Sequence, residues 1–191
     1  MARLSLLLPR RPVLLGSALV LAIAAGACSQ PVGQSSDAPV AESGTTEALS
    51  DTPSAAAIEA GSEFAQIEQT IFEQVNAYRD EQGLPPLEIS DTIRQQATAH
   101  SQAMAQGEVP VSHEGFDGRV EAIAKSVDYR SAAENVAYNE GYSSPGEQAV
   151  QGWLESPGHL ENIRGDYDLT GVGVAQSGQA YYFTQIFIEA P

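Results

Sequence analysis

The chain has 191 residues and a formal net charge of −16, from 25 Asp and Glu against 9 Lys and Arg. Such an acidic surface repels nucleic acid and anionic lipid headgroups, and no basic stripe interrupts it, so we expect no nucleic-acid partner. The length suffices for one domain with a complete hydrophobic core beside shorter accessory segments.

Residues 1–27 are typical of an export signal. Three arginines precede an apolar run of residues 13–25, which is too short to span a bilayer comfortably. The chain's only cysteine, Cys28, directly follows three small residues, and this arrangement resembles the lipobox of bacterial lipoproteins, whose cysteine is lipid-modified. We therefore expect a lipid anchor at Cys28 in the cell envelope. Cleavage by the ordinary signal peptidase, which would release a soluble secreted protein, is the alternative.

The next segment, residues 28–62, is predicted to be a disordered tether. After Cys28 it consists mainly of Ser, Ala, Gly, Pro and Thr, without Lys, Arg or any aromatic residue. It therefore offers little apolar surface to offset the entropy lost on folding. Residues 63–191 remain as one folded domain, which contains no cysteine and must be stabilised by its core rather than by disulfides.

Two helices are predicted at the start of this domain. The first extends from a cap at Ser62 to Gly83, because apolar residues recur there at helical spacing. The second begins at Ser90 and ends at Gly107. His100 lies on the apolar face of the second helix, and we expect it to be a buried core histidine.

Shorter elements follow along the chain. A short helix is predicted over residues 118–124, and another helix begins at Ser144 and is broken at residues 156–157. Alternating and β-rich residues predict a closing hairpin of strands 169–175 and 181–188. Helices first and an antiparallel hairpin last indicate the α+β class.

Two of the three histidines, His113 and His159, lie in turn-rich segments among small polar residues, and Glu134 precedes a predicted strand at residues 135–138. Such groups could bind a divalent metal such as zinc, transfer protons, or form a hydrogen-bonded hub inside the fold. The sequence has no HExxH, GxSxG, P-loop or GxGxxG motif. Covalent catalysis therefore has no evident nucleophile.

A set of short motifs over residues 66–188 resembles, in its order, the CAP superfamily of cysteine-rich secretory, antigen 5 and pathogenesis-related 1 proteins. Each motif alone has little specificity, but the ordered set is specific and is similar to the compact bacterial branch. The motifs are Asn76-Ala77-Tyr78-Arg79, Gly83-Leu84-Pro85-Pro86-Leu87, Ala99-His100-Ser101, Ser112-His113, Glu134-Asn135-Val136-Ala137, Trp153-Leu154-Glu155-Ser156-Pro157-Gly158-His159, Asn162-Ile163, Gly171-Val172-Gly173-Val174-Ala175 and Tyr182-Phe183-Thr184-Gln185-Ile186-Phe187.

The resemblance implies an α-β-α sandwich, with helices on both faces of a central antiparallel sheet. It also implies a cleft lined by a tetrad of two histidines and two acids. His113, Glu134 and His159 match three of these four positions.

The fourth tetrad position departs from the family pattern. The second acid of the family falls three residues after the tryptophan, where this chain has Ser156. The resemblance therefore leaves either Glu155 or Glu161 to take its place.

CAP domains are linked to the binding of lipids or sterols, peptides and divalent metals, and to proteolysis. The resemblance favours a monomeric, extracytoplasmic binding module whose cleft holds a small ligand, lipid or peptide, with a metal such as zinc at His113 and His159 as an addition. The alternative is a metal-dependent peptidase or esterase in which Glu134 orients a ligand or acts as the base. A structural role, in which the cleft only stabilises the fold, is the third reading.

Overall fold

The computed structural model of the chain describes residues 55–191. The predicted export signal, Cys28 and the part of the predicted tether before residue 55 lie outside the described residues, so these predictions stay predictions. Within the described part of the chain, no helix combines the length and the apolar character needed to cross a membrane.

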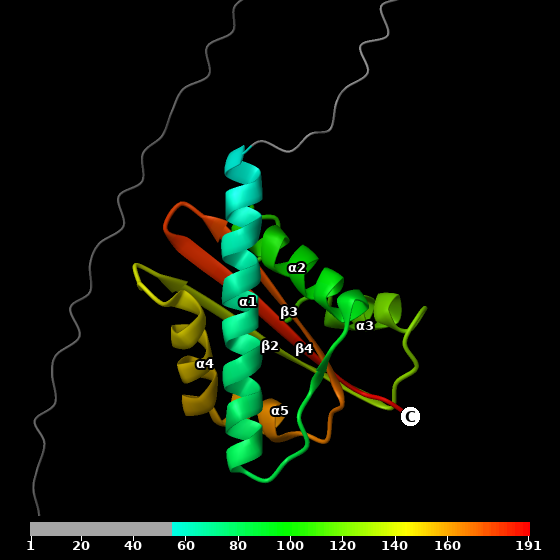
Figure 1. Cartoon of the computed structure of the whole chain (residues 1–191). Helices are drawn as coiled ribbons and strands as arrows, with labels where there is room; N and C mark the ends of the chain where they lie inside the picture. Colours follow the sequence, from blue (N-terminus) through cyan, green and yellow to red (C-terminus); the bar gives the residue numbers. More distant parts are fainter. Residues whose placement is uncertain (1–54) are drawn as a thin grey trace, which may run out of the picture. The chain divides into compact units, whose positions relative to one another are not determined.

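A mixed sheet of four strands forms the centre of the domain, in the order β1-β3-β4-β2 (Figure 1). The long strands β2 (Ser131–Glu140), β3 (Leu169–Ser177) and β4 (Ala180–Glu189) are antiparallel neighbours. The predicted hairpin is confirmed as β3 and β4. The three long strands confirm the central antiparallel sheet that the resemblance implies. The short β1 (Glu88–Ile89) adds one parallel pair, because the connector after the first helix runs beside the start of β3 in the same direction.

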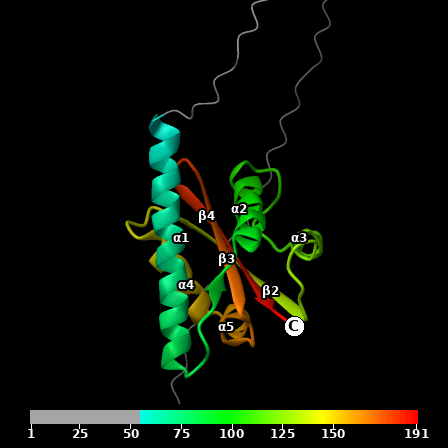
Figure 2. The ribbon, with the colours of Figure 1, turned by 45° about the vertical axis from the view of Figure 1, so that its right-hand side comes forward.

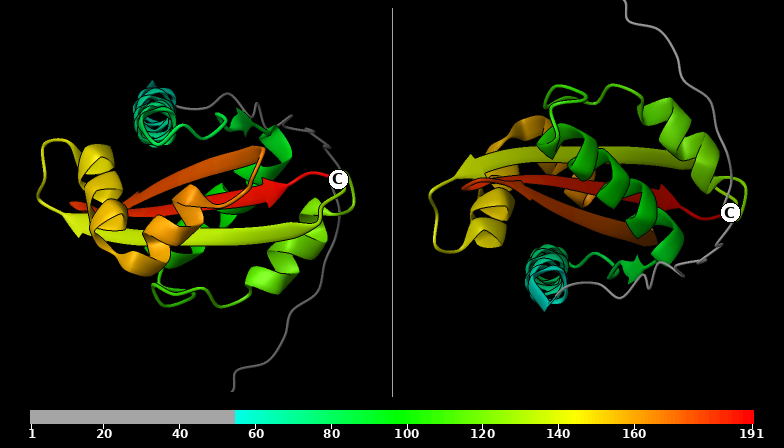
Figure 3. Two further views of the ribbon diagram at one scale, coloured as in Figure 1. Left: turned by 90° about the horizontal axis from the view of Figure 1, so that it is seen from below. Right: turned by 90° about the horizontal axis from the view of Figure 1, so that it is seen from above.

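Helices cover both faces of the sheet, as Figures 2 and 3 show. One face carries α1 (Ala55–Glu81), α4 (Pro145–Glu155) and α5 (Pro157–Arg164). The other face carries α2 (Asp91–Ala105) and α3 (Phe116–Ile123). The predicted α+β class and α-β-α sandwich are therefore confirmed.

Each face of the sheet has its own core, because successive side chains of a strand point to opposite faces. On the side of α1 and α4, Phe183 and Phe187 of β4 pack with the fully buried Trp153. On the side of α2, Ile186 and Ile188 of β4 pack with other buried apolar residues. The sheet is thus covered on both faces, and β1 and β2 form its two edges.

Helix α2 lies unusually close to β3. A Cβ atom added at Gly171 would overlap the backbone of Arg94, and one added at Gly173 would overlap the backbone of Thr98. The alternation of glycine and valine that predicts β3 therefore has a second role, because the absence of side chains at the glycines lets α2 pack directly against the sheet. Ser101 of α2 donates a hydrogen bond to the Gly173 carbonyl at 2.9 Å.

The predicted start of the first helix is wrong. Helix α1 begins at Ala55, ahead of the predicted cap at Ser62, so the end of the predicted tether is helical. Its first residues include several alanines, the residue with the highest helix propensity, and a composition argument for disorder overlooks this.

The predicted break at residues 156–157 separates two helices. Ser156 precedes Pro157 at the start of α5, an arrangement that suits a helix N-terminus. His159 consequently lies in the first turn of a helix rather than in an irregular loop. The short helix predicted over residues 118–124 is α3, which begins two positions earlier.

Candidate functional site

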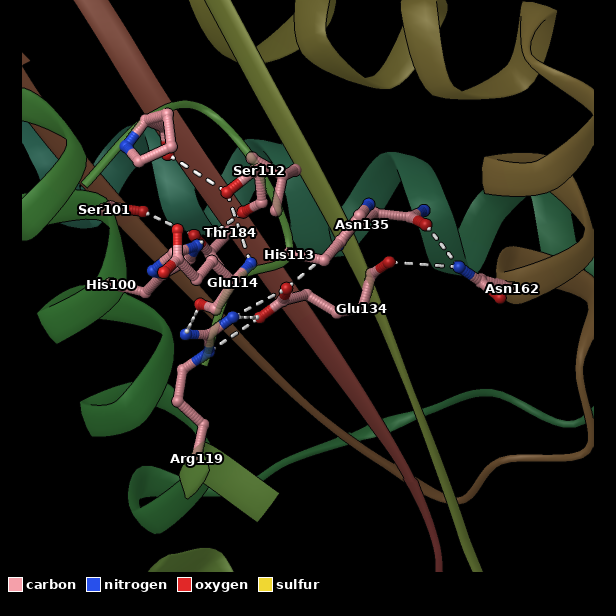
Figure 4. Close-up of polar contacts among 12 residues, drawn as sticks. His100, Ser101, Ser112, His113, Glu114, Arg119, Glu134, Asn135, Asn162 and Thr184 are labelled. Carbon is pink, nitrogen blue, oxygen red and sulfur yellow. Dashed lines mark hydrogen bonds and ion pairs between the residues drawn. The ribbon is translucent and has the colours of Figure 1, made fainter. Parts of the chain in front are cut away.

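Glu134 lies at the centre of a polar hub beside β2. It pairs with Ile186 across the sheet, so its side chain points to the face that carries α2 and α3, and it is 1% exposed. Its carboxylate accepts hydrogen bonds from Arg119 Nε at 2.8 Å and Arg119 Nη2 at 2.9 Å (Figure 4). His113 Nδ1 lies 3.0 Å from the same carboxylate. A buried carboxylate requires partners of this kind, because removal of a charge from water is costly.

Sequence reasoning missed Arg119. Its side chain projects from α3, is 11% exposed, and donates hydrogen bonds to Glu134 through two nitrogens. A third nitrogen, Nη1, donates to the Glu114 carbonyl at 2.9 Å. The only signal in the sequence is a cation inside a short amphipathic helix of a strongly acidic chain, and this does not identify its partner.

His113 lies in the loop between α2 and α3, and its side chain is 54% exposed. The buried His100 supports this loop, because its Nε2 lies 2.9 Å from the Ser112 carbonyl. A carbonyl oxygen only accepts, so Nε2 carries the proton and donates. Burial lowers the pKa of His100, although the Ser112 carbonyl opposes this effect. The prediction of a buried core histidine at His100 is confirmed.

His159 approaches His113 from the other side of β2. The centroids of the two rings are 6.4 Å apart, and their planes are inclined by 52°. Partial burial lowers the pKa of His159, and the neighbouring His113 lowers it further. The neutral imidazole is thus favoured at this position.

Two asparagines hold α5 against β2. Asn162 Nδ2 donates to the Glu134 carbonyl at 3.1 Å and to Asn135 Oδ1 at 2.9 Å. Asn135 Nδ2 in turn donates to the His159 carbonyl at 3.1 Å. These bonds fix the first turn of α5 and thereby the position of His159. The structure thus brings His113, Glu134 and His159 together around one strand.

Neither proposed fourth acid joins this group. Glu155 is exposed and accepts a hydrogen bond from Gln151 on the same helix at 2.9 Å. Glu161 is exposed on α5. Among residues 55–191, no three His, Cys, Asp or Glu side chains are arranged to hold a metal ion.

The distance between the two histidine rings limits how a metal ion could be coordinated by both of them. Two ring nitrogens bound to one zinc ion at about 2.0–2.1 Å lie at most about 4 Å apart. Rings whose centroids are 6.4 Å apart satisfy this only when their nitrogens point at each other. Zinc sites normally have three or four protein ligands. His113 and His159 therefore fit a weak two-histidine site at most, and zinc binding there stays a prediction.

A groove extends from His159 along the outer edge of β2, with a cavity volume of about 490 Å³. This volume lies within the range typical of ligand-binding sites. Helix α4 forms the opposite wall. The lining residues are Val136, Ala137, Tyr138, Asn139, Glu140, Tyr142, Gln148, Ala149, Gly152, Trp153 and His159.

Residues 72–187 match the model of the CAP cysteine-rich secretory protein family. Among curated proteins, YkwD of Bacillus subtilis is 35% identical over 137 residues, which cover 68% of this chain and 49% of YkwD. The membrane protein YlbC of the same organism is 34% identical over 127 residues, which cover 64% of this chain and 34% of YlbC. The matched part thus spans half or less of these two relatives.

Two solved structures have a similar fold. An extracellular protein of Bacillus anthracis that contains an SCP domain is 29% identical with a TM-score of 0.55, and the match covers 66% of this chain and 41% of that one. An outer surface protein of Borrelia burgdorferi is 19% identical with a TM-score of 0.56 and supports the fold alone, over 66% of this chain and 94% of that one. Since the family model covers more than half of the sequence, the chain belongs to the CAP family of cysteine-rich secretory proteins.

Proposed function

We propose that this protein is an exported, membrane-tethered binding module that holds a small ligand, lipid or peptide in the groove beside β2. The similarity to an extracellular SCP-domain protein and to a membrane protein supports export. The signal-like residues 1–27 and the lipobox-like Cys28 supply a route and an anchor.

The observation that carries this proposal is the adjacency of an open groove and a polar hub in which both oxygens of Glu134 already have partners. Glu134 has both carboxylate oxygens within hydrogen-bond distance of Arg119 or His113. A general base must direct a free lone pair at the proton that it removes. The contacts of Glu134 hold His113 and α3 in place, and this role favours a binding site over general-base chemistry at this carboxylate.

Filling the groove tests the binding function. Gly152 lines the groove, is exposed in α4, and has no atom within 4 Å of an added Cβ. Gly152→Leu should therefore fold normally and obstruct the groove. Gly61→Leu is the matched control, because Gly61 is an exposed glycine of α1 with equally open surroundings, outside the groove.

Native mass spectrometry of the full chain, after incubation with an aqueous and an organic extract of bacterial envelopes, provides the readout. We expect a small-molecule, lipid or peptide adduct on the wild type and on Gly61→Leu that Gly152→Leu lacks. An identical adduct pattern in all three proteins, or no adduct in any, would contradict a binding function of this groove.

The hydrolase alternative has a separate test. We expect no turnover of a broad peptide and ester panel above background, with or without zinc, by the wild type or by Glu134→Gln. Glu134→Gln should instead lower the unfolding temperature, because Arg119 loses its charged partner. Zinc-dependent turnover that disappears in Glu134→Gln without a change in unfolding would make the hydrolase the better assignment.

A further inference from the structure

The outer edge of β2 is closed in one half and open in the other. Trp153 Nε1 donates to the Val136 carbonyl at 3.2 Å, and Asn162 Nδ2 donates to the Glu134 carbonyl, so these carbonyls point away from β4. In an antiparallel strand every second residue directs its backbone groups to the same side. Tyr138 and Glu140 therefore direct their N–H and C=O groups outward as well, into the groove.

The backbone of this open half has no partner within the described part of the chain. Among residues 55–191, no backbone hydrogen bond from another segment reaches the N–H or C=O of Tyr138 or Glu140 on the outer side. The strand is the last in the sheet order, so β4 is its only partner among the strands that the structure describes (Figure 3). Such an edge presents a ready template for another extended chain.

A buried side chain in the groove also has a free acceptor. Asn139 is 7% exposed, and its Nδ2 donates to the Pro145 carbonyl at 2.8 Å. Its Oδ1 is one of only two buried side-chain oxygens or nitrogens without a hydrogen-bond partner among the described residues. Native proteins rarely leave such an atom unpaired, so this oxygen can accept a hydrogen bond from an ordered water or from a donor of a bound molecule.

The charge of the groove is acidic. Glu140 is the one Asp, Glu, Lys or Arg among the lining residues, and one oxygen of its carboxylate accepts a hydrogen bond from the Tyr138 hydroxyl at 2.8 Å. The whole chain has a net charge of −16, which attracts cationic partners. A lysine or arginine of a ligand would therefore be stabilised beside Glu140.

We propose that the groove binds an extended peptide that adds a strand to β2 at Tyr138 and Glu140, with a lysine or arginine side chain beside Glu140. This inference rests on the proposed binding function of the same groove and names its ligand class. Alternating donors and acceptors along a strand are matched in register by another peptide backbone. A lipid tail has no such groups, and a sugar lacks their spacing.

Peptide selection tests this assignment. A displayed library of random dodecapeptides is selected on the full-length wild type, with removal of phage that bind Gly152→Leu. The enriched peptides are synthesised, and their affinities are measured by fluorescence anisotropy. We expect lysine- or arginine-containing peptides that lose affinity by about tenfold or more on Gly152→Leu, while Gly61→Leu binds them like the wild type.

Backbone methylation of the synthetic peptide separates strand addition from side-chain recognition. An added strand uses every second amide, so N-methylation of one alternating set should weaken binding by about tenfold or more, and the other set should matter little. Glu140→Gln should weaken binding of the cationic peptide and reduce its dependence on salt.

Three outcomes would overturn the inference. Failure to enrich any peptide that distinguishes the wild type from Gly152→Leu is the first, and equal tolerance of both methylated sets is the second. The third is a different occupant of the groove. A sugar would be shown by binding of the oligosaccharide chitohexaose, and a second copy of the chain by dimerisation, if Gly152→Leu abolishes that binding or dimerisation. An envelope lipid or sugar adduct that needs an open groove would leave the binding function standing and remove only the peptide.

Discussion

The two halves of strand β2, around Glu134 and around Tyr138 and Glu140, differ in whether their polar groups have partners within the fold. Both belong to the exposed edge of a sheet, where backbone groups and polar side chains need partners. Around Glu134 the protein supplies these partners itself, through Arg119, His113 and Asn162. Around Tyr138 and Glu140, residues 55–191 supply none to the backbone on the outer side. The comparison indicates that the polar hub stabilises the fold and that the open half is available for a ligand.

Breaking the hub should have the largest effect. Arg119→Ala leaves the carboxylate of Glu134, 1% exposed, without its guanidinium, so we expect a loss of about 3–5 kcal/mol in the free energy of unfolding. Urea denaturation of both proteins measures this. Arg130→Ala is the control, because Arg130 is 64% exposed and lies 3.8 Å from Glu189. It should cost less than about 1 kcal/mol.

A second variant checks the reason for that loss. Replacement of both partners, as Arg119→Met with Glu134→Leu, removes the buried charge together with its counterion and should recover most of the stability. If Arg119→Ala proves as mild as Arg130→Ala, the hub does not stabilise the fold and the contrast between the two halves fails.

The sequence predicts the buried helix α2 and the central hairpin of this domain better than the edges of its sheet. Helix α2 and the β3–β4 hairpin follow from local apolar patterns, and each is confirmed. The pairing of β1 with β3 depends on two residues and on a contact distant in sequence, which no local pattern encodes. Helix α1 starts early because the propensity of alanine outweighs a composition typical of disorder.

The candidate site divides in the same way. The convergence of His113, Glu134 and His159 was expected only from a family resemblance, since their spacing along the chain does not place them together. Arg119 was missed because its partner is distant in sequence. The groove was not predicted either, because it depends on β2 being the last strand in the sheet order.

Removal of the side-chain amide of Asn162 should have an intermediate effect on stability and test the comparison between the two halves of β2. Asn162→Ala deprives the Glu134 carbonyl and Asn135 Oδ1 of their shared donor, so we expect a loss of about 1–3 kcal/mol in the free energy of unfolding. Tyr138→Thr changes the open half, where the tyrosine is 48% exposed and packs edge-on against Tyr182. It should cost less than about 1 kcal/mol. Equal losses in the two variants would contradict the contrast.

Acidification should lower the free energy of unfolding through His100, which supports the loop that carries His113. Burial lowers the pKa of His100 below its ordinary value of 6.5, so the unfolded chain binds the proton more readily than the folded one. Stability from this group is complete above about pH 6.5 and is lost as the pH falls below it, by at most about 1.4 kcal/mol per pH unit. His159 acts in the same direction, because its pKa is also lowered.

His100→Gln isolates this contribution, because its amide can still donate to the Ser112 carbonyl but cannot be protonated. The unfolding free energy of the wild type should fall more steeply between pH 7 and pH 5 than that of His100→Gln. Burial raises the pKa of Glu68, and this effect is common to both proteins and cancels in the comparison. Parallel pH profiles would show that His100 is not the group responsible.

Zinc should give the smallest effect, at the junction of the two halves where the ring centroids of His113 and His159 are 6.4 Å apart. With two protein ligands the affinity should be low, and zinc at a concentration equal to its Kd would stabilise the fold by only about 0.4 kcal/mol. Isothermal titration should show binding to the wild type that His159→Ala abolishes. Because only neutral imidazole binds metal, the affinity should decrease as the pH falls through about 6 to 7. Equal affinities of the wild type and His159→Ala would mean that the two histidines share no metal, and the groove beside them would then depend on its backbone edge alone.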